Sequence, residues 1–172
     1  APQVGAFETD LTVNGLKQAQ TSLVRTKTMA DKEEASRYNI AEGVYIIGDS
    51  VTLRATPGLQ EVLPDAQTDA QVSRNTKQAS AIMLYNSQNK ALPKVVVVAT
   101  GVNNPEDYKA DLDFLISNLP KGHQLVLVTP YEGDTSQATQ PYVEKYASYA
   151  CEVAQQYPYV EIADWNQVSK DN

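Results

Sequence analysis

Short apolar runs alternate with segments of helical period from residue 44 onward, and this alternation constrains the fold more than any other feature. The runs at 95–99 and 125–128 hold only aliphatic residues, as expected for strands buried on both faces, since half-exposed strands alternate apolar with polar residues. Such alternation is typical of a parallel sheet covered by helices. We expect strands at 44–47, 66–72, 94–98, 124–128 and 159–163. The prediction is a three-layer α/β/α fold around a mostly parallel sheet.

The segments between these runs carry helix signals. We expect one helix from Asn75 to about Lys90. A second should start at 104–107, where a proline suits the first turn and two carboxylates oppose the positive end of the helix dipole, and it should stop at Pro120. Its apolar stripe is Tyr108, Leu112, Leu115, Ile116 and Leu119.

A longer helix is predicted from about Pro141. Apolar and aromatic residues recur in it at spacings of three and four, which predicts a face packed on the sheet. The alternative is a platform on which sugars stack. These residues are Tyr142, Tyr146, Tyr149, Ala150, Val153 and Tyr157.

Residues 1–43 differ from the rest because they are polar and contain no strand run. We expect an approach or linker segment that is partly helical, at 16–23 and 30–38, followed by one folded domain at 44–172. The chain begins Ala1-Pro2 with neither Met nor a signal-type apolar core. This start is expected of a boundary inside a longer protein.

Charge and composition exclude several classes of function. The net charge of −7 disfavours a nucleic-acid partner. The longest apolar run, 95–99, is far shorter than the ~20 residues that cross a membrane. Cys151 and His123 are single residues of their types, so we expect no intrachain disulfide, no structural zinc and no other metal. No Gly-rich dinucleotide motif or Walker lysine loop follows a strand, and no cofactor is expected.

Polar residues follow the predicted strands at the edge where a parallel sheet binds ligands. Gly48 allows a sharp turn, and Ser50 then stands where a helix begins, a suitable place for a nucleophile. The alternative is that Ser50 is only the helix cap. Asn103, after the flexible Gly101, is placed to donate to an oxyanion, or else to share a helix cap with Asn104.

Two of these segments together resemble a known family. Residues 44–51, which contain Gly48-Asp49-Ser50, and residues 98–103, which end at Asn103, resemble the first and third blocks of the SGNH (GDSL-type) hydrolases. The longer stretches 48–54, 71–74 and 99–105 resemble the extracytoplasmic catalytic domains of the peptidoglycan O-acetyltransferase A family, in its streptococcal form. The resemblance covers about residues 44–172. It implies an SGNH-like, flavodoxin-like domain.

The resemblance also implies roles for individual residues. Ser50 is the nucleophile, and the oxyanion donors are the Ser50 amide, the Asn103 side chain and Ser73, which stands where the family normally has glycine. Ser73 can donate through its backbone or its hydroxyl. Gly48, Asp49 and Gly101 support the loops.

The family takes its general base from an Asp-x-x-His motif beyond the last strand, and this motif is not in the chain. Asp164 resembles the residue at the end of that strand rather than the triad aspartate. His123 precedes a strand at the opposite edge, where we expect it to face solvent. We therefore expect a domain that lacks its C-terminal part and its base and is inactive or weak, because an unactivated serine hydroxyl is a poor nucleophile.

By the same resemblance, the complete domain is a serine-dependent O-acetyltransferase. It would move acetyl through an acetyl-serine to the C6 hydroxyl of N-acetylmuramic acid in peptidoglycan glycan strands. The expected acetyl donor is supplied by an upstream integral-membrane acyltransferase domain, and the expected location is the cell-wall side of the membrane, as a monomer. Two alternatives remain: a carbohydrate or acetyl esterase of the SGNH family, and a non-catalytic glycan-binding SGNH-like domain.

Overall fold

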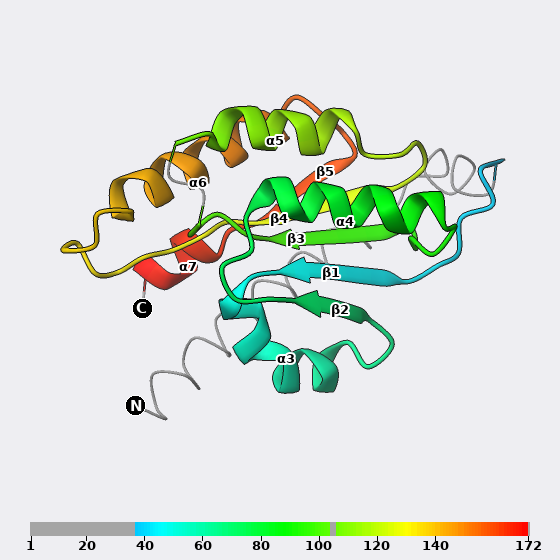
Figure 1. Cartoon of the computed structure of the whole chain (residues 1–172), viewed down its shortest axis with the longest axis horizontal. Helices are drawn as coiled ribbons and strands as arrows, with labels where there is room; N and C mark the ends of the chain where they lie inside the picture. The colour runs from blue at the N-terminus through cyan, green and yellow to red at the C-terminus, as the bar shows by residue number, and fades with distance from the viewer. Residues whose placement is uncertain (1–36, 104–105, 172) are drawn as a thin grey trace.

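Five parallel strands form the central sheet in the order β2-β1-β3-β4-β5 (Figure 1). The computed structural model describes residues 37–103 and 106–171. The strands are β1 (Val44–Gly48), β2 (Gln67–Ala70), β3 (Val95–Ala99), β4 (Gln124–Val128) and β5 (Val160–Ala163). All five predicted strands are confirmed, with bounds that shift by one residue in most cases and by up to two in β2.

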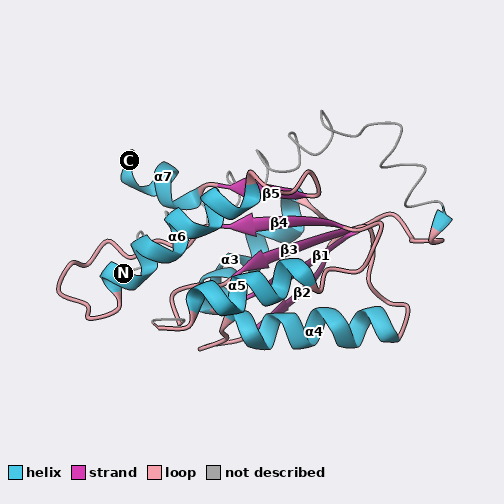
Figure 2. Ribbon diagram, turned by 90° about the horizontal axis from the view of Figure 1, so that it is seen from above, coloured by secondary structure: helices cyan, strands magenta, loops and turns pink. Residues whose placement is uncertain are grey.

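Side-chain alternation along the strands divides the core into two layers. On β3, Val96 and Val98 face one side of the sheet, while Val95 and Val97 face the other. The first side packs against α4 (Thr76–Gln88), α5 (Tyr108–Ser117) and α6 (Gln140–Ala154), and the second against α3 (Ser50–Val62) and α7 (Trp165–Lys170). Figure 2 shows these helices against the sheet. The predicted three-layer α/β/α fold is confirmed.

The helix between β2 and β3 begins where the sequence predicts. Asn75 caps α4, its side chain accepting from the Gln78 amide at 2.8 Å, while the Gln78 side chain accepts from the Asn75 amide at 2.9 Å. This reciprocal capping box satisfies two amides that have no partner within the helix.

The next helix begins later than predicted. Asp107 precedes α5, and the expected start at Asn104-Pro105 lies outside the described residues. Its stripe packs as expected, with Leu112, Leu115 and Ile116 buried.

The tyrosine row on α6 is only partly a packing face. Tyr146 is buried, but Tyr142 is exposed, and Tyr157 lies beyond the helix end. The prediction that the whole row packs on the sheet is therefore wrong for Tyr142, which lies only four residues, about one turn, before Tyr146. Lysine side chains lie over two of these rings: Lys109 Nζ is 5.5 Å from the ring centre of Tyr149, and Lys145 Nζ is 5.3 Å from that of Tyr142. A sugar that stacked on either ring would compete with this cation–π contact.

The expected helix at 16–23 and nearly all of that at 30–38 lie outside the described residues, so the division into a linker at 1–43 and a domain at 44–172 stays a prediction. Within the described part of the chain, no helix has the length and apolarity needed to cross a membrane.

His123 lies at the amino-terminal edge of the sheet, just before β4, as predicted, but it does not face solvent. It is buried, with 8% of its surface exposed. Its Nδ1 lies 2.8 Å from the Pro93 carbonyl oxygen, which only accepts, so Nδ1 carries the proton. Burial lowers the pKa of His123. The expectation failed because Pro93 is 30 residues away in sequence and covers the ring only in the folded chain.

Lys94, at the same edge, is 1% exposed, and its Nζ has no hydrogen-bond partner among the described residues. A buried polar group without a hydrogen-bond partner is costly. We predict that Lys94→Met, which keeps an unbranched side chain, raises the free energy of unfolding by about 1–3 kcal/mol. Thermal unfolding checks this, with Lys77→Met on the exposed side of α4 as the control. A lower melting temperature for Lys94→Met would contradict it.

Candidate active site

The candidate site lies where the strand order reverses. The chain leaves β1 and enters α3 on one face of the sheet, whereas α5, the helix that follows β3, lies on the other face. Adjacent strands whose helices diverge in this way leave a crevice outside their carboxyl ends, the usual ligand site of open α/β sheets. Ser50 follows β1 and Asn103 follows β3, so the fold places both outside the carboxyl ends of these neighbouring strands, where such a crevice is expected.

Asp49, not Ser50, caps α3. Its carboxylate accepts from the Val51 amide at 3.0 Å, and its own amide donates to the Ala99 carbonyl of β3 at 3.2 Å. Ser50 is the first helical residue and is partly exposed. The alternative in which Ser50 is merely the cap is therefore wrong, because the cap position is filled by its neighbour.

Close packing around Gly48 and Gly101 explains why these positions have no side chain. A Cβ on Gly48 would lie 2.2 Å from Thr52 Oγ1. Gly101 has a φ of +131°, and a Cβ there would lie 2.6 Å from Pro130 Cγ. A side chain at position 48 would clash with the first turn of α3, and one at position 101 would push the loop after β3 away from the loop after β4.

The loop after β2 is held by a buried arginine that the sequence analysis missed. Arg74 donates to the Asp69 carboxylate at 2.8 Å, the Asp69 carbonyl at 2.7 Å and the Gly48 carbonyl at 3.4 Å. Ser73, just before it, has a φ of +64°, a left-handed conformation that favours glycine. The Asp69–Arg74 spacing of five residues is the signal that could have drawn attention to this contact.

Asn103 is joined to that same loop. Its Nδ2 donates to the Arg74 carbonyl at 3.2 Å, and α5 begins after Asp107, so Asn103 is not the cap of α5. An amide nitrogen carries two hydrogens, so one remains for another acceptor. The contacts of Arg74 thus connect the three loops that carry Ser50, Ser73 and Asn103.

A second buried cluster consists of three hydroxyl groups near the end of β3. The sequence analysis missed this cluster too. The hydroxyl of Tyr146 lies 2.6 Å from Thr76 Oγ1, which lies 2.7 Å from Thr100 Oγ1. Burial raises the pKa of Tyr146 to about 12. This cluster joins the start of α4 and the middle of α6 to the end of β3, and nothing in the local sequence indicates it.

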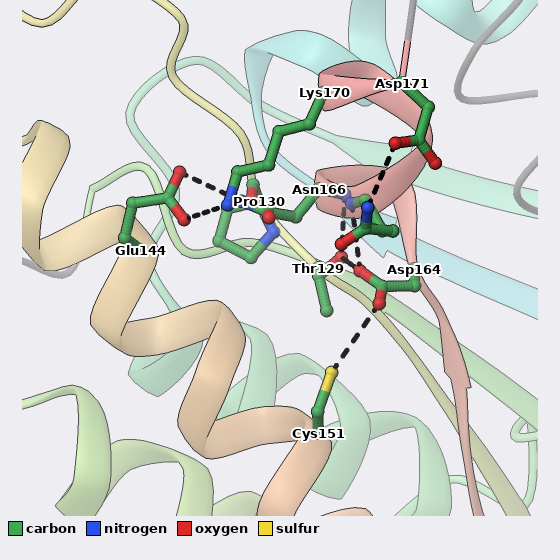
Figure 3. Close-up of polar contacts among 9 residues, drawn as sticks. Thr129, Pro130, Glu144, Cys151, Asp164, Asn166, Lys170 and Asp171 are labelled. Atoms are coloured by element: carbon green, nitrogen blue, oxygen red, sulfur yellow. Dashed lines mark hydrogen bonds and ion pairs between the residues drawn. The ribbon is translucent and has the colours of Figure 1, made fainter.

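Asp164 follows the last residue of β5, and it caps α7, a role that the sequence analysis did not predict. Its Oδ1 accepts from Thr129 Oγ1 at 2.8 Å and from the Gln167 amide at 3.2 Å (Figure 3). Asn166 donates from its backbone to Thr129 Oγ1 and from its side chain to the Pro130 carbonyl, each at 2.9 Å. These bonds fasten α7 to the loop that leaves β4.

Comparison with known proteins places the chain in a family. No protein-family profile matches it, and no curated protein does. Among solved structures, the C-terminal catalytic domain of Streptococcus pneumoniae peptidoglycan O-acetyltransferase A (OatA), solved with a methylsulfonyl adduct, is 61% identical with a TM-score of 0.75. The match covers 77% of this chain and 74% of that one. The chain belongs to the OatA catalytic-domain family.

The predicted resemblance to this family is thereby confirmed. A second solved structure, described as a platelet activating factor from the same genus, is 13% identical over 86% of this chain and 78% of that one, with a TM-score of 0.50. This second likeness is one of fold alone.

The other reactive side chains of this OatA-family domain do not compete with Ser50. Burial, followed by the nearby Asp164 carboxylate, raises the pKa of Cys151 to about 11, so the thiol is protonated at neutral pH. His123 lies at the opposite edge of the sheet. In the described ranges, no three His, Cys, Asp or Glu residues come together as metal ligands.

Asp49 should make the stability of this OatA-family domain depend on pH. Burial raises its pKa from 3.8 to about 6, although the Val51 and Thr52 amides and the Arg54 charge act in the opposite direction. The folded state therefore holds this proton more tightly than the unfolded state. Its contribution is complete below about pH 4 and is lost as the pH rises through 6.

We predict that Asp49→Asn removes this loss, because an amide cannot ionise and its oxygen still caps Val51. At pH 7 the variant should be more stable than the parent by about 2–3 kcal/mol. Urea unfolding of both proteins from pH 4 to pH 7 measures the difference. A difference that stays constant over this range would contradict the prediction.

Proposed function

We propose that this domain transfers acetyl groups to peptidoglycan through Ser50, with the C6 hydroxyl of N-acetylmuramic acid as the acceptor. The observation that carries the proposal is the position of Ser50, partly exposed in the first turn of α3 at the crevice, in a chain 61% identical to an O-acetyltransferase catalytic domain. The sulfonyl adduct in that relative is consistent with this chemistry, because nucleophilic side chains attack sulfonyl groups much as they attack acyl groups.

The reaction has two steps. Ser50 Oγ loses its proton to a base and attacks the acetyl carbonyl, and collapse of the tetrahedral intermediate releases the donor alcohol and leaves acetyl-serine. The sugar hydroxyl then attacks this ester, loses its proton and restores Ser50. Transfer exceeds hydrolysis only if the glycan hydroxyl is held closer to the attack geometry than water is.

The negative charge of each intermediate needs donors fixed in advance. We assign this role to the Ser50 amide, the Ser73 amide and the Asn103 side chain. Asn103 is already fixed by its bond to the Arg74 carbonyl, and Arg74 fixes the loop that carries Ser73. The left-handed φ of Ser73 supports donation through the backbone rather than the hydroxyl, because it is the conformation that a glycine would adopt there.

The general base is the component that the described residues do not supply. The only histidine of the 172 residues is His123, which is remote from Ser50. Asp49 is adjacent to Ser50 in sequence, but its carboxylate accepts from the Val51 amide as the helix cap. We propose that an Asp-x-x-His motif of the family type activates Ser50.

The proposed setting is the cell-wall side of the membrane, with peptidoglycan glycan strands as substrate and a membrane-embedded acyltransferase domain supplying the acetyl group. The net charge of −7 suits a substrate other than nucleic acid. The monomeric state stays a prediction.

We predict that Ser50→Ala removes one acetyl group per chain from the adduct formed with an activated acetyl ester, because the variant has no hydroxyl at position 50 to form the acetyl-serine. The parent should acetylate slowly and faster when free imidazole replaces the base. Intact mass measures the adduct. The melting temperature of Ser50→Ala should change little, since the residue is partly exposed. An equal adduct in the variant, with or without imidazole, would contradict the proposal.

We predict that Asn103→Ala slows imidazole-assisted acetylation by roughly 10²–10³-fold, or about 2.7–4 kcal/mol, the typical effect of losing one oxyanion donor. Ser73→Gly is the matched comparison. It removes the hydroxyl but keeps the amide and suits the φ of +64°, so the rate should stay within about twofold. A large loss in Ser73→Gly would assign donation to the hydroxyl instead.

A further inference from the structure

Two buried hydrogen-bonding atoms near the crevice have no partner in the described part of the chain. They are Thr52 Oγ1 on α3 and Trp165 Nε1 on α7. The two residues are 1% and 5% exposed. Each such atom is costly, because burial removes its hydrogen bond to water without replacing it. Native structures seldom leave such groups unsatisfied, so each needs an explanation.

Both residues line the same small cavity. It lies between the carboxyl ends of the central strands and the starts of α3 and α7, and its polar lining residues include Asp49, Thr100 and Thr129. Its volume is about 10 Å³, and a cavity needs roughly 10–15 Å³ to hold one water molecule. A cavity this small has no room for a substrate group.

The chemistry of the lining residues suits a water molecule. Trp165 Nε1 only donates, so its partner must accept, whereas Thr52 Oγ1 both donates and accepts. The hydroxyls of Thr100 and Thr129 already pair with Thr76 and Asp164. The Asp49 carboxylate accepts from the Val51 amide and has further lone pairs. A water that accepts from Trp165, donates to Asp49 and bonds to Thr52 makes three hydrogen bonds, the usual number for a buried water.

We propose that this cavity is a binding site for one ordered water molecule, held by Trp165, Thr52 and Asp49. The water joins α7 to the turn that carries Ser50, since Asp49 and Thr52 flank that residue closely in sequence. Trp165 is thereby a positioning residue for the turn, and it acts through the water. The water site itself does not depend on the proposed reaction.

Two substitutions test the proposal through the sign of the change that each causes in the melting temperature. Trp165→Phe keeps the ring but removes the N–H, and Thr52→Val keeps the shape but removes the hydroxyl. If a water is bound, each substitution takes away one of its partners and should lower the melting temperature by roughly 2–4 °C. The double variant should lose less than the sum, because the second substitution acts on a site already weakened. If the cavity is dry, each removes an unsatisfied group, and the melting temperature rises additively.

Thr56→Val is the matched control on the same helix. The Thr56 hydroxyl donates to the Thr52 carbonyl at 3.1 Å, and it does not line the cavity. Its effect should add to that of Trp165→Phe without coupling. Coupling as strong as that of Thr52→Val would overturn the proposal.

NMR gives a direct readout, because Trp165 is the only tryptophan of the chain and has a single indole N–H signal. We expect cross-relaxation between this proton and a long-lived water, and its loss in Thr52→Val. An indole proton that shows no contact with water in the parent would overturn the proposal whatever the activity of Ser50.

Discussion

The structure depends on the parallel pairing of β1 with β3. The pairing runs from Val44 opposite Val95 to Gly48 opposite Ala99, so the two strands end at the same level. Their hydrogen bonds are made between buried backbones, and both faces of the strands are covered with aliphatic side chains. A slip of one residue in this pairing would shift one loop relative to the other, so its register sets the level at which Ser50 and Asn103 leave the sheet.

Backbone carbonyls organise the candidate site as much as side chains do. The Gly48 carbonyl accepts from the Gln71 amide and from Arg74, the Ala99 carbonyl accepts from Asp49, and the Arg74 carbonyl accepts from Asn103. Each contact joins loops that follow different strands. This arrangement fixes the proposed oxyanion donors before any substrate binds, which is the condition under which such donors lower a barrier most.

The same region contains a feature that reduces stability. The Asp49 carboxyl ionises in a buried place, and burial raises its pKa to about 6. Unfavourable local energies of this kind concentrate at functional sites, where surrounding packing compensates for them. Here α7 provides part of that support, through Asn166 on the β4 loop and the Lys170–Glu144 ion pair, whose Nζ and Oε2 lie 2.6 Å apart (Figure 3).

The sequence alone determined the layers, the strands and the edge that carries the site, because these follow from local periodicity and from the common direction of parallel strands. Ser50 and Asn103 were predicted as site residues for the same reason, since each lies within four residues of the end of a buried strand. Only the tertiary structure decided that Asp49 is the cap, that Arg74 connects the loops, that His123 is buried and that Tyr142 is not. The contacts of Arg74 with Gly48, of His123 with Pro93 and of Asn166 with Thr129 span 26 to 37 residues. The spacing of apolar residues indicates which face of a helix or strand is buried. It does not indicate which distant polar group will contact a given side chain.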